Sequence, residues 1–179
     1  MAFGVAASFV LLILSGIGLY TFKDELEPTQ TSQTKHHGTK DLYQLIKDNP
    51  KALDLEDWRQ VLDSETFRVT REFGTERAFT SPLNNIKNNS GTFQCSNCGQ
   101  ALFHAKAKYE SGTGWPSFFD VISPKVIGLS TDFKIGYQRS EVHCSRCGAH
   151  LGHVFNDGPQ PTGLRYCMNG VALKYNPGS

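Results

Sequence analysis

The sequence predicts a mainly β protein with antiparallel strands and a few short helices on its N-terminal side. From Gly91 onward, short apolar stretches alternate with turns, and no alternation of strands with long helices is visible. Helical spacing of apolar residues is confined to the region 41–73. Two Cys-x-x-Cys turns fall in the strand region, which is typical of a sheet protein held together by a metal ion.

Three short helices are expected before the strands. In DLYQLIKDN, residues 41–49, the apolar residues share one helical face, and a proline follows. LEDWRQVL, residues 55–62, has the same pattern. ETFRVTREF, residues 65–73, follows Ser64 as a candidate N-cap and precedes Gly74 as a terminator. We expect these helices to pack on the outside of the sheets.

The strands are expected at four places along the C-terminal half: residues 91–94, 133–137, 141–143 and 165–173. Phe133, Ile135 and Tyr137 alternate with polar or small residues, as in a half-buried strand. The first and third stretches each lead into a Cys-x-x-Cys turn. The last stretch is expected to be a closing strand that carries Cys167.

Four of the five cysteines form two matching pairs, each followed by glycine: Cys95 with Cys98, and Cys144 with Cys147. Such turns present two thiolates on one side of a loop, which suits a tetrahedral structural Zn²⁺ site. The 45 residues between the pairs (99–143) indicate that the metal joins two separate parts of a sheet. A rubredoxin-like iron site and two disulfides are the alternatives.

Cys167 has no cysteine partner left, so it is either a buried apolar residue or a reactive thiol. Arg165 lies two positions earlier, so on a strand both side chains face the same way, and a guanidinium stabilises a thiolate. His150 and His153 precede Cys167 across a Gly/Pro-rich turn. A thiolate with imidazoles nearby has the groups needed for nucleophilic attack and proton delivery.

Three motifs carry a family resemblance: VTREFGTERAFTSPL, FQCSNCGQALFHAKAKYESGTGWPSFFD and HCSRCGAHLGHVFNDGPQPTGLRYCMNGVAL. Together they resemble the methionine-R-sulfoxide reductases of the MsrB type, over about two-thirds of the chain (55–175). The resemblance implies a fold of two antiparallel sheets with a few helices at the start. It also implies one structural Zn²⁺ per chain, bound by the four paired cysteines Cys95, Cys98, Cys144 and Cys147.

The resemblance also assigns roles around the fifth cysteine. Cys167 matches the family nucleophile, and His150, His153 and Asn169 match polar residues around the sulfoxide oxygen. Trp115 and Phe155 match aromatic residues that hold the methyl group on sulfur, and Arg165 matches the arginine before the nucleophile. Without the resemblance, the two aromatic residues could be core residues, and His150 could be a structural histidine or a substitute metal ligand.

The implied chemistry is attack of the Cys167 thiolate on the sulfoxide sulfur of methionine-R-sulfoxide in proteins, which leaves a sulfenic acid. Many relatives place a resolving cysteine in SGxGWP, where this chain has Thr113. We therefore expect no internal disulfide, and direct reduction by thioredoxin or a small thiol. Such an enzyme would repair oxidised proteins under oxidative stress.

The chain is expected to have three parts: an anchor or signal segment (1–22), a polar linker (23–40) and a catalytic domain (41–179). Residues 2–20 carry no charge and would just span a bilayer as a helix. No basic region precedes them, which favours an uncleaved membrane anchor over a signal peptide, although export after cleavage is the alternative. A buried core helix is disfavoured by the terminal position.

The net charge of +1 gives no indication of a nucleic-acid surface, and we expect a monomer. Two other function classes compete with the reductase. A four-cysteine binding module would use Cys167 only for packing. A thiol-based redox sensor would form the sulfenic acid with peroxide but ignore sulfoxides.

Overall fold

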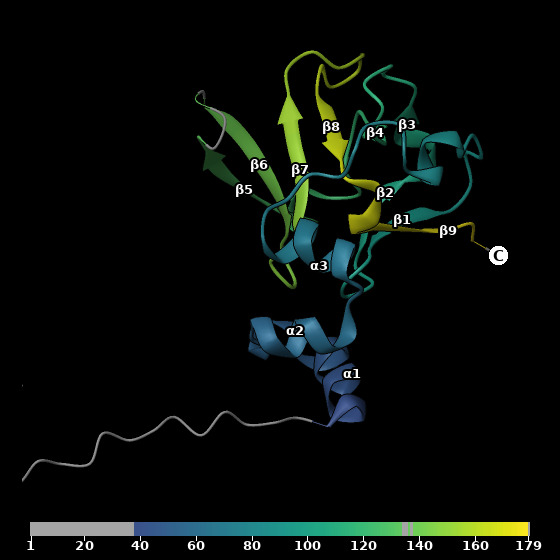
Figure 1. The fold of residues 1–179 in the computed structure, drawn as a ribbon. Helices are drawn as coiled ribbons and strands as arrows, with labels where there is room; N and C mark the ends of the chain where they lie inside the picture. The colour runs from purple at the N-terminus through teal and green to yellow at the C-terminus, as the bar shows by residue number, and fades with distance from the viewer. Residues whose placement is uncertain (1–37, 134–135, 137, 179) are drawn as a thin grey trace, which may run out of the picture. The chain divides into compact units, whose positions relative to one another are not determined.

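The computed structural model describes residues 38–133, 136 and 138–178. These residues form two antiparallel sheets preceded by three short α-helices (Figure 1). They belong to a compact unit, His36–Ser179, and the other unit, Met1–Lys35, lies outside them. The expected anchor (1–22) and nearly all of the expected linker (23–40) therefore fall outside the described residues. Within the described part of the chain, no helix is long and apolar enough to cross a membrane.

The three helices are α1 (Thr39–Asp48), α2 (Leu55–Val61) and α3 (Ser64–Arg71). Leu42 of α1 and Trp58 of α2 are buried, because each lies on the apolar face of its helix. Asp54 begins α2 with a capping box: its carboxylate accepts from the backbone N–H of Asp57 at 2.9 Å. All three predicted helices are thus confirmed.

Both ends of α3 differ from the prediction in detail. The N-cap is Asp63 and not Ser64, because the Asp63 carboxylate accepts from the N–H groups of Glu65 and Thr66. The residue in the left-handed region after the helix is Phe73 (φ 56°) and not Gly74. Gly74 is needed for a close approach instead, since a Cβ there would lie 2.8 Å from the backbone oxygen of Arg68.

The larger sheet has the strand order β3-β4-β8-β7-β6-β5 and the smaller sheet has the order β2-β1-β9, with every pair antiparallel. The strands are β1 (Thr92–Cys95), β2 (Ala101–His104), β3 (Lys108–Tyr109), β4 (Ser117–Phe118), β5 (Ile127–Asp132), β6 (Arg139–Cys144), β7 (His150–Phe155), β8 (Arg165–Met168) and β9 (Leu173–Asn176). The predicted fold class, two antiparallel sheets with short N-terminal helices, is confirmed.

The core lies between the two sheets and is rich in aromatic rings. Phe93 and Phe103 of the smaller sheet pack on Phe118 of the larger sheet, with ring centroids 4.9 and 4.2 Å apart. All three side chains are fully buried. Helix α3 packs against β7 and against the 3-10 turn Gly170–Ala172, which follows β8 (Figure 1). The part of the larger sheet that carries Cys167 is therefore held between the core and the segment that follows α3.

The prediction of one closing strand over 165–173 is wrong, because this stretch contributes to two strands that belong to different sheets. β8 ends at Met168 and β9 begins at Leu173. Between them, the N–H groups of Gly170 and Val171 donate to the buried carboxylate of Glu76, at 2.6 and 3.0 Å. These bonds replace sheet pairing and turn the chain.

The strand expected over 133–137 is also not found in the described residues. β5 ends at Asp132, and Phe133 is 64% exposed instead of half-buried. Ile135 and Tyr137 lie outside the described residues. Asp132 pairs in register with Arg139, so the six residues between them form the β5–β6 connection.

Candidate active site and metal centre

The four paired cysteines converge on one point between the sheets. Their sulfur atoms all lie within 4.8 Å of one another, and all four residues are buried. The Sγ atoms of Cys95 and Cys147 are 3.7 Å apart, and those of Cys98 and Cys144 are 3.6 Å apart. A disulfide needs about 2.05 Å, whereas a tetrahedron with Zn–S bonds of about 2.3 Å has edges of about 3.8 Å. The cluster fits a four-thiolate metal ion.

This metal centre joins the two sheets rather than two parts of one sheet. Cys95 ends β1 of the smaller sheet, and Cys144 ends β6 of the larger sheet. The helices attach to the same place, because the Arg71 guanidinium of α3 donates to the Cys147 carbonyl at 2.8 Å. The Arg71 guanidinium also stacks on the Trp58 ring of α2 at 3.8 Å.

Cys167 lies in the middle of the larger sheet, with Ser117 of β4 opposite it on one side and His153 of β7 on the other. Residues opposite each other on antiparallel strands share a face of the sheet. A cavity of about 120 Å³ opens at this point. Its lining residues are Thr75, Trp115, Arg139, Gly152, His153, Phe155, Cys167 and Asn169. Five of the seven predicted catalytic and substrate-binding residues line it; His150 and Arg165 do not.

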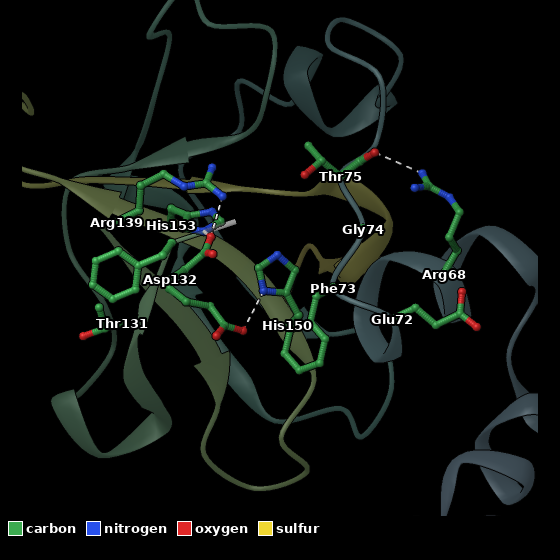
Figure 2. A pocket seen from close by; sticks show the side chains of 12 residues that line it. Arg68, Glu72, Phe73, Gly74, Thr75, Thr131, Asp132, Arg139, His150 and His153 are labelled. Carbon is green, nitrogen blue, oxygen red and sulfur yellow. Dashed lines mark hydrogen bonds and ion pairs between the residues drawn. The ribbon is translucent and has the colours of Figure 1, made fainter. Parts of the chain in front are cut away.

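His153 is held by a carboxylate that it shares with an arginine. Its Nε2 lies 2.7 Å from Oδ2 of Asp132, and the Arg139 guanidinium donates to the same oxygen. Figure 2 shows these three side chains close together in the larger cavity that adjoins the Cys167 cavity. Burial lowers the pKa of His153, whereas the hydrogen bond to Asp132 raises it and the Arg139 charge lowers it. His153 is therefore biased towards giving up a proton.

His150 lines a second, larger cavity of about 690 Å³ that shares His153, Thr75 and Arg139 with the first (Figure 2). Its Nδ1 lies 2.7 Å from Oε1 of Glu141, and the His150 hydrogen bond lowers the pKa of that carboxyl. The rings of His150 and His153 are 5.5 Å apart. His150 thus lies beside His153 and does not line the Cys167 cavity.

Trp115 and Asn169 are both fixed by the backbone of Glu76. The indole N–H of Trp115 donates to the Glu76 carbonyl at 3.2 Å. The Asn169 side-chain oxygen accepts from the Glu76 N–H at 3.0 Å, and its amide nitrogen donates to the Leu151 carbonyl at 3.1 Å. The segment after α3 therefore sets the positions of two cavity walls.

Arg165 acts on the cavity through Phe155. Its guanidinium forms two hydrogen bonds with the Asp157 carboxylate, at 2.9 and 2.8 Å, and lies 4.3 Å from the Phe155 ring centroid. The Asp157 bond raises the pKa of Arg165 and the Arg165 bond lowers that of Asp157. The ring that lines the cavity is thus held by a fixed cation.

Thr113 lies next to Cys167, at the position in SGxGWP where the resemblance implies a resolving cysteine in many relatives. Its Oγ1 lies 3.8 Å from the Cys167 sulfur. No other cysteine is near, since the remaining four form the metal cluster.

Sequence reasoning missed four residues that position the site: Glu76, Asp132, Arg139 and Glu141. Their hydrogen-bond partners lie 93, 21, 7 and 9 residues away along the chain, respectively. No local spacing rule connects such pairs. The pairing of β5 with β6 and of β6 with β7 would have been a usable signal. It places Asp132 opposite Arg139 and Glu141 opposite His153.

Comparison with known proteins agrees with this geometry. The SelR domain model matches residues 62–177. Relatives named "Peptide methionine sulfoxide reductase MsrB" include one from Leptospira interrogans, 51% identical over 121 residues, covering 67% of this chain and 91% of that protein. The one from Methanosarcina mazei is 53% identical over 120 residues, covering 67% and 85%. The one from a Synechococcus strain is 48% identical over 128 residues, covering 72% and 93%.

The domain match covers well over half of the chain, and the relatives are aligned across nearly all of their own length. The match includes the metal cluster, the segment after α3 and all strands. The chain belongs to the SelR-domain family, the MsrB methionine-R-sulfoxide reductases.

Proposed function

We propose that this chain is a peptide-methionine (R)-S-oxide reductase, an oxidoreductase that converts methionine-R-sulfoxide in proteins to methionine with Cys167 as its nucleophile. The observation that carries the proposal is one small cavity that holds Cys167, His153 and two aromatic side chains together. A thiol, a proton donor and an apolar wall are the groups that reduction of a methyl sulfoxide requires.

The methyl group on sulfur would lie against Trp115 and Phe155, which are both fixed from behind. In that position the sulfoxide sulfur faces Cys167. The thiolate attacks the sulfur, and the oxygen takes up a proton as it moves to the cysteine. Methionine leaves reduced, and Cys167 is oxidised to a sulfenic acid.

His153 would supply the proton. Because Arg139 keeps Asp132 paired, the Nε2 of His153 is held by the carboxylate, and Nδ1 is the nitrogen left to exchange a proton. Asn169 supports the opposite wall and Arg165 holds Phe155. His150, together with Glu141, would orient substrate in the adjoining cavity.

The sulfenic acid would be reduced by an external thiol. Position 113 holds threonine, so no cysteine beside Cys167 can form an internal disulfide. The thiol attacks the sulfenic sulfur, water leaves, and a second thiolate releases Cys167 from the mixed disulfide. We propose thioredoxin or a small thiol as this reductant, and repair of oxidised proteins under oxidative stress as the role.

One Zn²⁺ would occupy the four-cysteine cluster as a structural ion. Thiolate donors at this spacing suit zinc, and no position is open to substrate because all four sulfurs are buried. The ion would hold the sheets together at a site separate from the Cys167 cavity.

From the sequence we further propose that the enzyme is a monomer anchored to a membrane by residues 2–20, with export after cleavage as the alternative. Expression of the full chain and of a version without residues 1–37, followed by membrane sedimentation, tests this. The anchor is supported if the full chain sediments with the membranes and the shortened version does not. If both versions stay in the supernatant, the anchor is contradicted.

The activity is tested with a peptide carrying either the R or the S diastereomer of methionine sulfoxide, with dithiothreitol as reductant and metal-loaded protein. We expect turnover of the R form alone, and its loss in Cys167→Ser, because serine is a poor nucleophile towards sulfoxide. Turnover of the S form, or of neither form, would refute the proposal; the second outcome would favour a binding module.

A further inference from the structure

Three hydroxyl groups, those of Thr113, Ser111 and Ser117, form a chain that ends at Cys167. Thr113 Oγ1 lies 3.8 Å from the Cys167 sulfur and 2.8 Å from Ser111 Oγ. Ser111 Oγ lies 2.7 Å from Ser117 Oγ. Ser117 is fully buried and donates to the Trp115 carbonyl at 3.1 Å. Nothing in the proposed reaction accounts for this chain.

Because each hydroxyl has one hydrogen, the direction of one bond in the chain sets the direction of the others. A hydroxyl has one hydrogen to donate, and a carbonyl has none. Because Ser117 donates to the Trp115 carbonyl, it accepts from Ser111. Ser111 therefore accepts from Thr113, which has then used its own hydrogen. In this direction Thr113 can only accept from Cys167, which must be a protonated thiol.

The opposite direction fits the ionised cysteine. Each hydroxyl can rotate so that its hydrogen points to its other neighbour in the chain. Thr113 then donates to the thiolate, Ser111 donates to Thr113, and Ser117 donates to Ser111. No proton moves from one oxygen to another. The bond to the Trp115 carbonyl is given up, and a stronger, charge-assisted bond to sulfur is gained.

We propose that Thr113 is a further catalytic residue, whose hydroxyl donates a hydrogen bond to the Cys167 thiolate when the chain of Ser111 and Ser117 reverses direction. The proposal rests on Cys167 being the nucleophile of the reductase. Thr113 touches the reacting sulfur, whereas Ser111 and Ser117 are positioning residues. After oxidation, the same hydroxyl can donate to the sulfenic oxygen while an external thiol approaches.

Within this hydroxyl chain, Ser111 has the opposite effect on Cys167 from that of Thr113. With the thiol, Ser111 accepts the hydrogen of Thr113. With the thiolate, Ser111 has to turn and the Ser117 bond to the Trp115 carbonyl is lost, so the presence of Ser111 favours the thiol. Removing Thr113 and removing Ser111 should therefore change the reactivity of Cys167 in opposite directions. Other ionisable groups that face Cys167 stay the same in such variants: His153 and Arg139 line its cavity, and Arg165 and Tyr109 interact with its charge.

The test is the rate of Cys167 alkylation by iodoacetamide at pH 7 in metal-loaded protein, read by mass spectrometry of the Cys167 peptide. We expect Thr113→Val to react about threefold to tenfold more slowly, as loss of one hydrogen bond implies. Thr113→Ser keeps the hydroxyl and should stay within about twofold of the unmodified protein. Ser111→Ala should react at least as fast as the unmodified protein.

Three results would overturn the proposal: Thr113→Val as fast as the unmodified protein, Thr113→Ser as slow as Thr113→Val, or Ser111→Ala slowed. Thermal unfolding of each variant controls for the fold. Because alkylation needs no sulfoxide, this result is independent of turnover: failure of the reductase assay with the expected alkylation order would reject the activity and keep the hydroxyl chain.

Discussion

Asp132 controls the protonation of His153 although it does not line the Cys167 cavity. Its Oδ2 accepts from Arg139 and from His153, and this bond raises the His153 pKa against the lowering effect of burial. In Asp132→Asn the carboxylate is lost and the Arg139 charge remains, so the His153 pKa falls further. If protonated His153 delivers the proton, the falling limb of the pH–rate profile moves to lower pH.

The measurement is kcat for the R-sulfoxide peptide between pH 5 and 9. Asp48→Asn, an exposed substitution on α1, is the matched control and should leave the profile in place. A profile of unchanged midpoint in Asp132→Asn would show that Asp132 has only a structural role.

For single residues, only the motifs in the sequence could indicate which side chains lie near Cys167. HLGHVF and RYCMN indicate His153 and Cys167, and their roles stay predictions. Asp132 could not be selected, because its importance depends on the β5–β6 and β6–β7 pairings, which bring it to His153. Burial and shared hydrogen bonds are properties of the fold and leave no local pattern.

The segment after α3 joins the helical part of the chain to the turn between β8 and β9. The Glu76 carboxylate is buried and accepts from the N–H groups of Gly170 and Val171. In Glu76→Gln one oxygen becomes an NH₂ group, which cannot accept, so one N–H stays buried without a partner. We expect the free energy of unfolding to fall by about 2 kcal/mol.

Urea unfolding of metal-loaded protein measures this change. Glu72→Gln is the control, since its carboxylate is half exposed and pairs with Arg59 on the surface; it should change stability by less than about 0.5 kcal/mol. Equal values for the two variants would contradict the role given to Glu76.

Element types could be predicted, whereas some of their ends could not. The three helices follow from apolar spacing, but Asp63 and Ser64 are both good caps, and only the hydrogen bonds distinguish them. The stretch 165–173 has the composition of a strand throughout. Its division depends on Glu76, which lies about ninety residues earlier.

For the whole molecule, the metal centre is the expected source of much of the stability. It joins β1 to β6, and through Arg71 it also holds α3. Cys98→Ser should lose the metal and lower the free energy of unfolding by several kcal/mol, because the three remaining buried cysteines then lack their ion. Cys167→Ser should keep the metal and the stability. Metal content by mass spectrometry and thermal unfolding measure both, and a stable, metal-free Cys98→Ser would refute a structural ion.

The fold class could be predicted because turn spacing, helix spacing and paired cysteines all agree. The position of the cluster between two sheets could not, since the sequence gives the separation of the pairs but not which strands lie beside them. β1 pairs with β2, its neighbour in sequence, and also with β9, nearly eighty residues later.

That late pairing has a consequence for how the protein is made. During synthesis, Cys95 and Cys98 leave the ribosome well before Cys144 and Cys147, and β1 waits longer still for residues 173–176. The metal ion can therefore be completely enclosed only after most of the domain has been translated. Until then the first pair of thiols lacks its full set of partners, so the availability of the metal ion during translation would limit the yield of folded protein.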